Sequence, residues 1–237
     1  MAFRLPAVTG TKPPLAQDNV MPHDIEIIGR RSSHYTRQLR LLAHELGIDY
    51  ALRPIHDLLS DDPAAYAGNP ALKLPALRCG EATVWGSMNA CRWLARQTPD
   101  GEARVFWPEQ ASSALAMNAH ELLAHAMAVQ VEVVFHEIVS KRAPDAASRK
   151  RRASLGGSLR WIDAHWRGIR AELPIGRIAI FDVGLFCLLE HLPFRNPMDL
   201  SAMPHLRAFA REFGTRASAQ ATPYSFDAPP PETLRTT

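Results

Sequence analysis

The sequence predicts an α/β domain built on a small sheet, followed by an all-helical bundle domain. Three observations predict this division. Short β-branched segments alternate with helical patterns from residue 24 to residue 96, long apolar helical faces fill the chain after residue 107, and no strand-like alternation dominates there. The length of 237 residues is sufficient for two small domains.

The first predicted strand is the β-branched segment IEII at residues 25–28, which Gly29 closes. Apolar residues then recur at the i, i+3, i+4 and i+7 spacing that lines one face of a helix: Leu39, Leu42, Ala43 and Leu46. Gly47 follows this run and supplies the left-handed residue at which helices commonly end. The domain therefore begins with a strand and a helix.

The rest of this domain continues with short strands. Residues 50–55 form a second strand candidate, and residues 57–69 a polar connection that contains proline. Residues 74–78 and 82–85 are strands close enough for an antiparallel hairpin, and a helix follows at residues 88–95. This order predicts a parallel crossover beside a hairpin, in one sheet covered by helices.

The C-terminal half carries helical patterns separated by proline and glycine. They are predicted at residues 108–139, 147–167, 181–191 and 204–219. The domain boundaries follow from these patterns: a flexible tail at 1–23, the α/β domain at 24–96, a linker at 97–107, the all-helical domain at 108–222 and a second flexible tail at 223–237.

The composition excludes several functional classes. With 46% hydrophobic and 22% charged residues the chain is typical of globular proteins, and no run approaches the ~20 apolar residues of a membrane span. The N-terminus lacks the apolar core of a secretory signal. A net charge of +3 without a clustered basic face disfavours nucleic-acid binding. Three cysteines without CxxC spacing suit a reducing compartment, so we expect a cytoplasmic protein without membrane or nucleic-acid partners.

Three segments carry a resemblance to a known family. They are GRRSS at 29–33, followed by a helix that ends in ELG at 45–47, then NPALKLPAL at 69–77 and GSMNACRWLA at 86–95. In this order they resemble the active-site loop, the Asn-Pro-x-x-Lys-Val-Pro-x-Leu segment and the Glu-Ser-x-Ala-Ile-x-x-Tyr-Leu segment of cytosolic glutathione S-transferases of the bacterial serine type. Weaker similarity extends through residues 181–185 and 205–220.

The resemblance implies a thioredoxin-like N-terminal domain that binds glutathione, an all-helical domain that supplies the second substrate pocket, and a homodimer. It implies a cis bond between Leu74 and Pro75, which would present the backbone of Leu74 to an extended peptide. Lys73 and Ser87 would complete the glutathione contacts, with Ser87 at a helix start that can receive a carboxylate. The family's glutamate is Gly86 here, so one partner of the substrate's amino group is missing.

The resemblance also implies how the thiol is activated. A hydroxyl that donates to the glutathione sulfur favours the thiolate, and the N-terminus of the following helix adds a partial positive charge. The family spacing assigns this role to Ser33, with Ser32 as the rival position. From the residues alone, either serine is equally consistent with an ordinary helix cap.

Three other hypotheses remain. The chain could be a catalytically silent binding or scaffold protein of the same fold, a reading that Gly86 supports. Ser32 and Ser33 followed by Arg37 are also similar to the zeta class of glutathione-dependent isomerases, although His34 stands where that class has cysteine. No metal site is expected, because His120 and His125 are five residues apart instead of the four of an HExxH helix. Glutathione as co-substrate is the only small molecule besides the electrophile that we expect, and no further cofactor.

Overall fold

The computed structural model describes residues 25–228, so the predicted tail at 1–23 lies outside the described part, as do residues 229–237 of the predicted C-terminal tail. The N-terminal half is a four-stranded sheet in the order β2-β1-β3-β4. Its strands are β1 (Ile25–Gly29), β2 (Ala51–Pro54), β3 (Ala76–Cys79) and β4 (Ala82–Trp85). β1 runs parallel to β2 and antiparallel to β3, and β3 pairs with β4 as the predicted hairpin.

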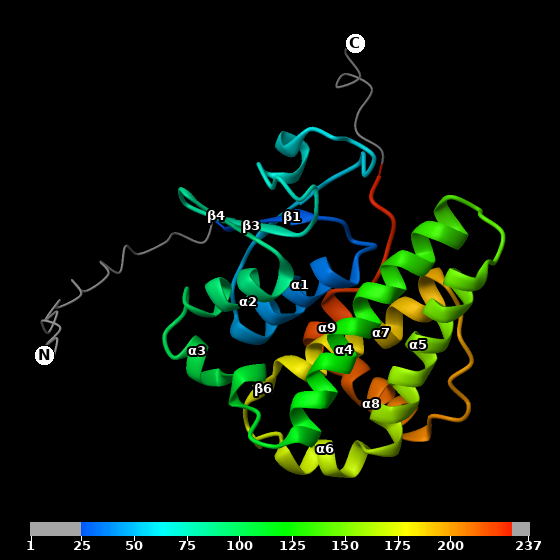
Figure 1. Ribbon diagram of the computed structural model, residues 1–237. Coiled ribbons are helices and arrows are strands. Elements are labelled where there is room, and N and C mark those ends of the chain that lie inside the picture. Colours follow the sequence, from blue (N-terminus) through cyan, green and yellow to red (C-terminus); the bar gives the residue numbers. More distant parts are fainter. Residues whose placement is uncertain (1–24, 229–237) are drawn as a thin grey trace, which may run out of the picture.

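Two helices cover one face of this sheet, α1 (His34–Leu46) and α2 (Ser87–Ala95), and both lie on the same side of it in Figure 1. Gly47 ends α1 in the left-handed conformation, with φ 72°, as the sequence predicts. The opposite face is covered by the connection that holds the short helix η2 (Pro63–Tyr66), where Tyr66 packs on Ile28 and Ile55. The domain is thioredoxin-like, with a mixed sheet between helical layers.

From residue 108 to residue 228 the chain is helical apart from loops and one short strand, β6 (Ile178–Ala179). The helices of this part are η3 (Pro108–Gln110), α4 (Ala114–Val133), the π-helical extension η4 (Val134–Val139), α5 (Ala146–Ala164), α6 (Trp166–Glu172), α7 (Ile180–Arg195), α8 (Pro204–Gly214) and α9 (Ala217–Ala221). The predicted helix at 147–167 is thus two helices. They separate at His165. Its ring Nδ1–H donates to the Trp161 carbonyl at 2.8 Å, which gives a carbonyl of the last turn of α5 a side-chain hydrogen bond.

The predicted linker at 97–107 has secondary structure of its own. It contains the short helix α3 (Gly101–Arg104) and the strand β5 (Val105–Phe106). β5 pairs in parallel with β6, directly before α7. A two-residue strand has no detectable alternation, so the sequence pattern did not reveal this pairing.

One apolar core runs through both halves. α1 packs against α7 and α9 as well as α2, so it is sandwiched between the sheet and the helical domain. The largest fully buried side chains come from both domains and include Ile27, Leu39, Leu94, Phe181 and Phe186. The position of α1 matters for function because the predicted catalytic serines precede it.

The helix Ala114–Val139 is long and apolar enough to cross a membrane by length and composition, and 39% of its most apolar window is buried inside the protein. It packs against α5 and α7 as part of the bundle. The apolar residues on one side of this helix therefore pack in the core. On its other side it leaves exposed apolar residues, among them Met117 and Phe135.

Candidate functional site

The loop between β1 and α1 holds Ser33 at the N-cap of α1. The backbone of Ser33 is extended, as helix caps require, and its Oγ accepts a hydrogen bond from the Thr36 N–H at 3.2 Å. The hydroxyl hydrogen stays available for another acceptor, since the cap uses only an oxygen lone pair. Ser33 is half-buried, and Ser32 beside it is buried.

Gly29 allows this loop to form. A Cβ at Gly29 would lie 2.3 Å from the Oγ1 of Thr36, which is fully buried against it. The same Oγ1 accepts a hydrogen bond from the Arg30 N–H at 3.2 Å. Thr36 therefore fixes the strand-to-helix turn through a space that only glycine leaves open.

The segment before β3 forms the second part of the site. The Leu74–Pro75 bond is cis, as predicted. Buried Asn69 shapes the approach to it, because its Nδ2 donates to the Lys73 carbonyl at 2.9 Å and its Oδ1 accepts from the Ala71 N–H at 3.0 Å. The side chain of Lys73 is exposed, Leu74 is half-buried and Pro75 is buried.

The backbone of Leu74 is unused within the described residues. Neither its N–H nor its C=O takes part in any hydrogen bond among residues 25–228, since the pairing of β3 with its neighbours begins at Ala76. Main-chain groups in this state can bind an extended peptide in the manner of an added strand.

The start of α2 is the third part. Gly86 is its N-cap, with φ 83° and ψ 140°, a conformation that L side chains rarely adopt. Its N–H donates to the Pro75 carbonyl at 3.1 Å, which ties this turn to the cis-proline segment. Ser87 is the first residue of α2 and is half-buried. The free N–H groups of the first turn suit a carboxylate.

The sheet register brings these three parts together. β1 and β3 are antiparallel with Ile28 opposite Ala76, and β3 and β4 are antiparallel with Ala76 opposite Trp85. The residues that follow β1, precede β3 and follow β4 must therefore meet at one edge of the sheet. All seven predicted site residues lie there: Ser32, Ser33, Lys73, Leu74, Pro75, Gly86 and Ser87.

Two residues of the C-terminal half hold the serine loop, and the sequence analysis did not find either. His191 of α7 donates its Nε2–H to the Ser32 carbonyl at 3.2 Å. Asp227 accepts from the Arg31 N–H at 3.0 Å, and its carboxylate lies 3.8 Å from the Nε atoms of Arg30 and Arg31. They lie 159 and 196 residues from the groups they bind, so no local pattern could have indicated them.

The segment 223–228 belongs to the predicted flexible tail, yet it makes specific contacts. Besides the bonds of Asp227, the Tyr224 hydroxyl donates to the Cys187 carbonyl of α7 at 2.6 Å. Burial raises the pKa of the Tyr224 phenol well above its ordinary value, so this hydroxyl remains a donor. The chain after α9 thus returns across α7 to the loop beside the predicted site.

Two residues of the zeta-like hypothesis do not face this site. His34 is buried, its Nε2 lies 3.1 Å from the Met127 carbonyl, and burial holds its pKa well below the ordinary value. Arg37 is buried between Phe186 and Tyr224, against α7. Within the described residues, no group of three or more His, Cys, Asp or Glu side chains lies close enough to hold a metal ion.

Comparison with known proteins agrees with this geometry. Residues 32–97 match the family model described as the glutathione S-transferase N-terminal domain. The sequence has no match among curated proteins.

Solved structures with a similar fold include glutathione S-transferase III in its apo form, with a TM-score of 0.66 and 24% identity over 88% of this chain and 99% of that one. A glutathione transferase family member from Pseudomonas fluorescens Pf-5 with bound glutathione has a TM-score of 0.66 and 23% identity over 85% and 99%. A theta class enzyme from Xanthomonas axonopodis pv. citri with glutathione bound has 0.62 and 24% over 86% and 98%. The chain therefore has the glutathione transferase fold.

Proposed function

We propose that this protein is a glutathione transferase that binds glutathione at the sheet edge described above and activates its thiol for attack on a small electrophile. The observation that carries the proposal is the convergence of the capping hydroxyl of Ser33, the unused backbone of Leu74 and the open first turn of α2. These groups match a peptide with a thiol and a free carboxylate. Two of the similar structures hold bound glutathione, which supports the same assignment.

Each group has a role in this proposal. The N–H and C=O of Leu74 bind the peptide backbone, and the start of α2 with Ser87 binds the γ-glutamyl carboxylate. Lys73 adds a positive charge at the exposed end. The hydroxyl of Ser33 donates to the sulfur while its oxygen still caps α1, and the α1 N-terminus adds roughly half a positive charge. A free thiol titrates near 8.5, so both effects raise the thiolate fraction at neutral pH.

We propose further that the protein works as a homodimer in the cytoplasm in detoxification. A catalytically silent binding protein is the second candidate, and Gly86 favours it: no carboxylate is present at the position where the family places the partner of the substrate's amino group. Retention on immobilised glutathione, followed by elution with free glutathione, tests glutathione binding as such. A chain that is retained but shows no turnover with standard electrophiles would be the silent form.

The first prediction tests the role of Ser33. Ser33→Ala should lower turnover about ten- to a hundredfold and affect glutathione affinity much less, because a charge-assisted hydrogen bond of roughly 1.5–3 kcal/mol forms only with the thiolate. The pKa of the bound thiol should rise in the variant. Thiolate absorbance of bound glutathione against pH measures this in the wild type, Ser33→Ala and Ser32→Ala.

Loss of the helix cap needs its own control, because Ser33→Ala also removes the bond to the Thr36 N–H. Ser113 also caps a helix, accepting from the Ala116 N–H at 3.1 Å at the start of α4, and its hydroxyl donates to the Glu172 carboxylate as well. Ser113→Ala should therefore lower stability by more than the ~1 kcal/mol of a lost cap and leave the thiol pKa unchanged. If only Ser32→Ala shifts the thiol pKa, Ser32 is the donor; if neither does, the hydroxyl mechanism is wrong.

A further inference from the structure

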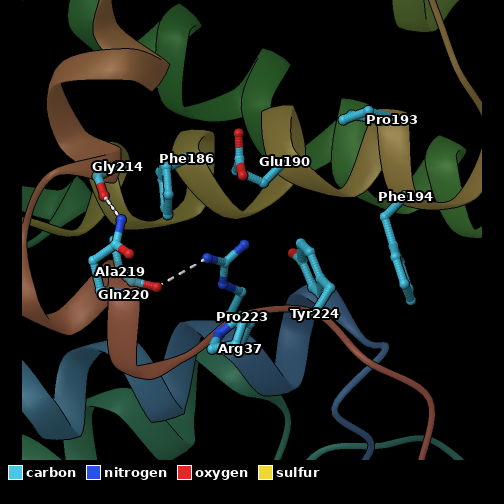
Figure 2. A pocket seen from close by; sticks show the side chains of 10 residues that line it. All are labelled: Arg37, Phe186, Glu190, Pro193, Phe194, Gly214, Ala219, Gln220, Pro223 and Tyr224. Atoms are coloured by element: carbon cyan, nitrogen blue, oxygen red, sulfur yellow. Dashed lines mark hydrogen bonds between the residues drawn. The ribbon is translucent and has the colours of Figure 1, made fainter.

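A separate cavity lies between α1, α7 and the chain after α8. Its volume is about 490 Å³, and it is lined among others by Arg37, Phe186, Glu190, Phe194 and Tyr224 (Figure 2). None of the seven predicted glutathione-site residues lines it. Ligand cavities are typically about 300–1,000 Å³.

Arg37 is the cationic group of this cavity, and no carboxylate among residues 25–228 lies within ion-pair distance of it, although Glu190 lines the same cavity. The residue is only 3% exposed. Its Nη2 donates to the Ala219 carbonyl at 3.4 Å, and its Nε has no hydrogen-bond partner. Arginine stays charged in proteins and is almost never fully buried unless paired, so this site calls for an anion.

Aromatic rings fix the direction of the guanidinium. Its central carbon lies 4.8 Å from the ring centre of Phe186 and 4.4 Å from that of Tyr224. Figure 2 shows the Nη atoms pointing from α1 toward α7, with one ring on either side. The faces of the group are thus covered by rings. Along its edge, Nη2 bonds the Ala219 carbonyl and the Tyr224 side chain is a further partner, so the unpartnered Nε is the position left for a carboxylate.

The opposite wall carries an acid and further aromatic surface. Glu190 of α7 is half-buried, and its carboxylate makes no hydrogen bond or ion pair with any described residue. Phe194 stacks on Tyr224 with 5.3 Å between ring centres and is half-buried. The cavity therefore offers a cation, an acid facing it and an apolar wall beside them.

We propose that this cavity is a second binding site for a small carboxylate that carries an apolar or aromatic group. The carboxylate binds the edge of the Arg37 guanidinium, and the apolar group packs on Phe194 and Tyr224. Two classes of ligand have this chemistry, simple aryl carboxylates and amino acids. Glu190 distinguishes them, because it repels a simple carboxylate and attracts the ammonium group of an amino acid.

Calorimetric titration of the full chain with phenylacetate, and separately with phenylalanine, tests the site. We expect saturable binding of one molecule per chain, with equal affinity in the presence and absence of S-hexylglutathione. Arg37→Met should weaken binding about ten- to a hundredfold. Arg40→Met is the matched control, because Arg40 is the next buried arginine of α1 and does not line this cavity.

Glu190→Gln distinguishes a binding role of Arg37 from a merely structural one, because it changes the affinities for the two probes in opposite directions. It should strengthen phenylacetate binding and weaken phenylalanine binding, and it keeps the proposal testable if Arg37→Met does not fold. Three results would overturn the proposal: neither probe binds, Arg37→Met and Glu190→Gln both leave the affinities unchanged, or S-hexylglutathione displaces the probe, which would place it in the catalytic cleft.

Discussion

Ala179 occupies the N-cap of α7, a largely buried helix. Its backbone is extended, with φ −73° and ψ 118°, but its side chain cannot bond the first turn. Asp182 in the first turn instead forms an ion pair with Arg170 at 2.6 Å. Burial nevertheless raises the pKa of Asp182, so this pair does not fully offset the desolvation of the carboxylate.

Ala179→Ser should therefore stabilise the protein. The new hydroxyl can accept a bond from the first turn of α7, which is worth about 1 kcal/mol and raises Tm by about 2–4 °C in a chain of this size. Thermal unfolding followed by circular dichroism measures the shift. Ala179→Cys is the control, since its thiol has similar size but accepts hydrogen bonds only weakly. An equal shift in both variants would mean that packing, and not capping, is the cause.

At the scale of elements, α1, α4 and α7 meet around two buried histidines. The rings of His34 and His191 contact edge to face, with centres 4.5 Å apart. Burial, with a further contribution from Arg195, lowers the pKa of His191 to about 4. Its Nδ1 faces Gln130 at 3.2 Å, so the neutral ring that bonds Ser32 is the folded form.

This contact predicts acid lability. In the unfolded chain His191 becomes protonated as the pH falls below its ordinary pKa of 6.5. In the folded protein it stays neutral until about pH 4, so acid favours the unfolded state. The stabilisation is complete above pH 6.5 and is lost between 6.5 and 4, by roughly 3 kcal/mol at 1.36 kcal/mol per pKa unit. Urea unfolding at several pH values measures this slope.

His191→Gln should make the slope shallower, leaving the contribution of His34. The control is His125→Gln on the exposed face of α4, which should leave the slope as in the wild type. A wild-type slope in His191→Gln would assign the acid lability to other groups.

At the scale of the whole molecule, the outer face of α4 and η4 carries exposed apolar side chains among polar ones such as Glu121 and Glu132. Met117 is 54% exposed and Phe135 36%, and they lie about five helical turns apart on the same face. Ile138 and Val139 continue this surface. Exposed apolar side chains of this size suit a subunit contact.

The proposed homodimer predicts a light-scattering mass of about twice 26.3 kDa at micromolar concentration. Met117→Glu should shift the mass toward that of one chain, because burying an unpaired carboxylate in an interface is costly. Ile175→Glu is the control, since Ile175 is a fully exposed apolar residue outside α4 and η4. A wild-type mass of one chain would reject the dimer.

Local signals in the sequence were sufficient for most of the fold. Three local patterns each favour one backbone conformation: the β-branched run of β1, the spacing of Leu39 and Leu46, and the glycine at position 47. The strand, the helix and the helix end that they predicted were all confirmed. The sequence supplied the three motifs of the predicted site, and the strand register then placed them at one edge of the sheet. The roles of Ser32 and Ser33 stay a prediction.

The tertiary structure alone decided the rest. The pairing of β5 with β6, the bonds of His191 and Asp227 to the serine loop, and the burial of Arg37 beside a cavity all join residues far apart along the chain. Arginine at position 37 has the same local propensity whether it faces solvent or a buried anion site. Its surroundings depend on how α7 and the C-terminal segment pack on α1, and no pattern within a single helix records that packing.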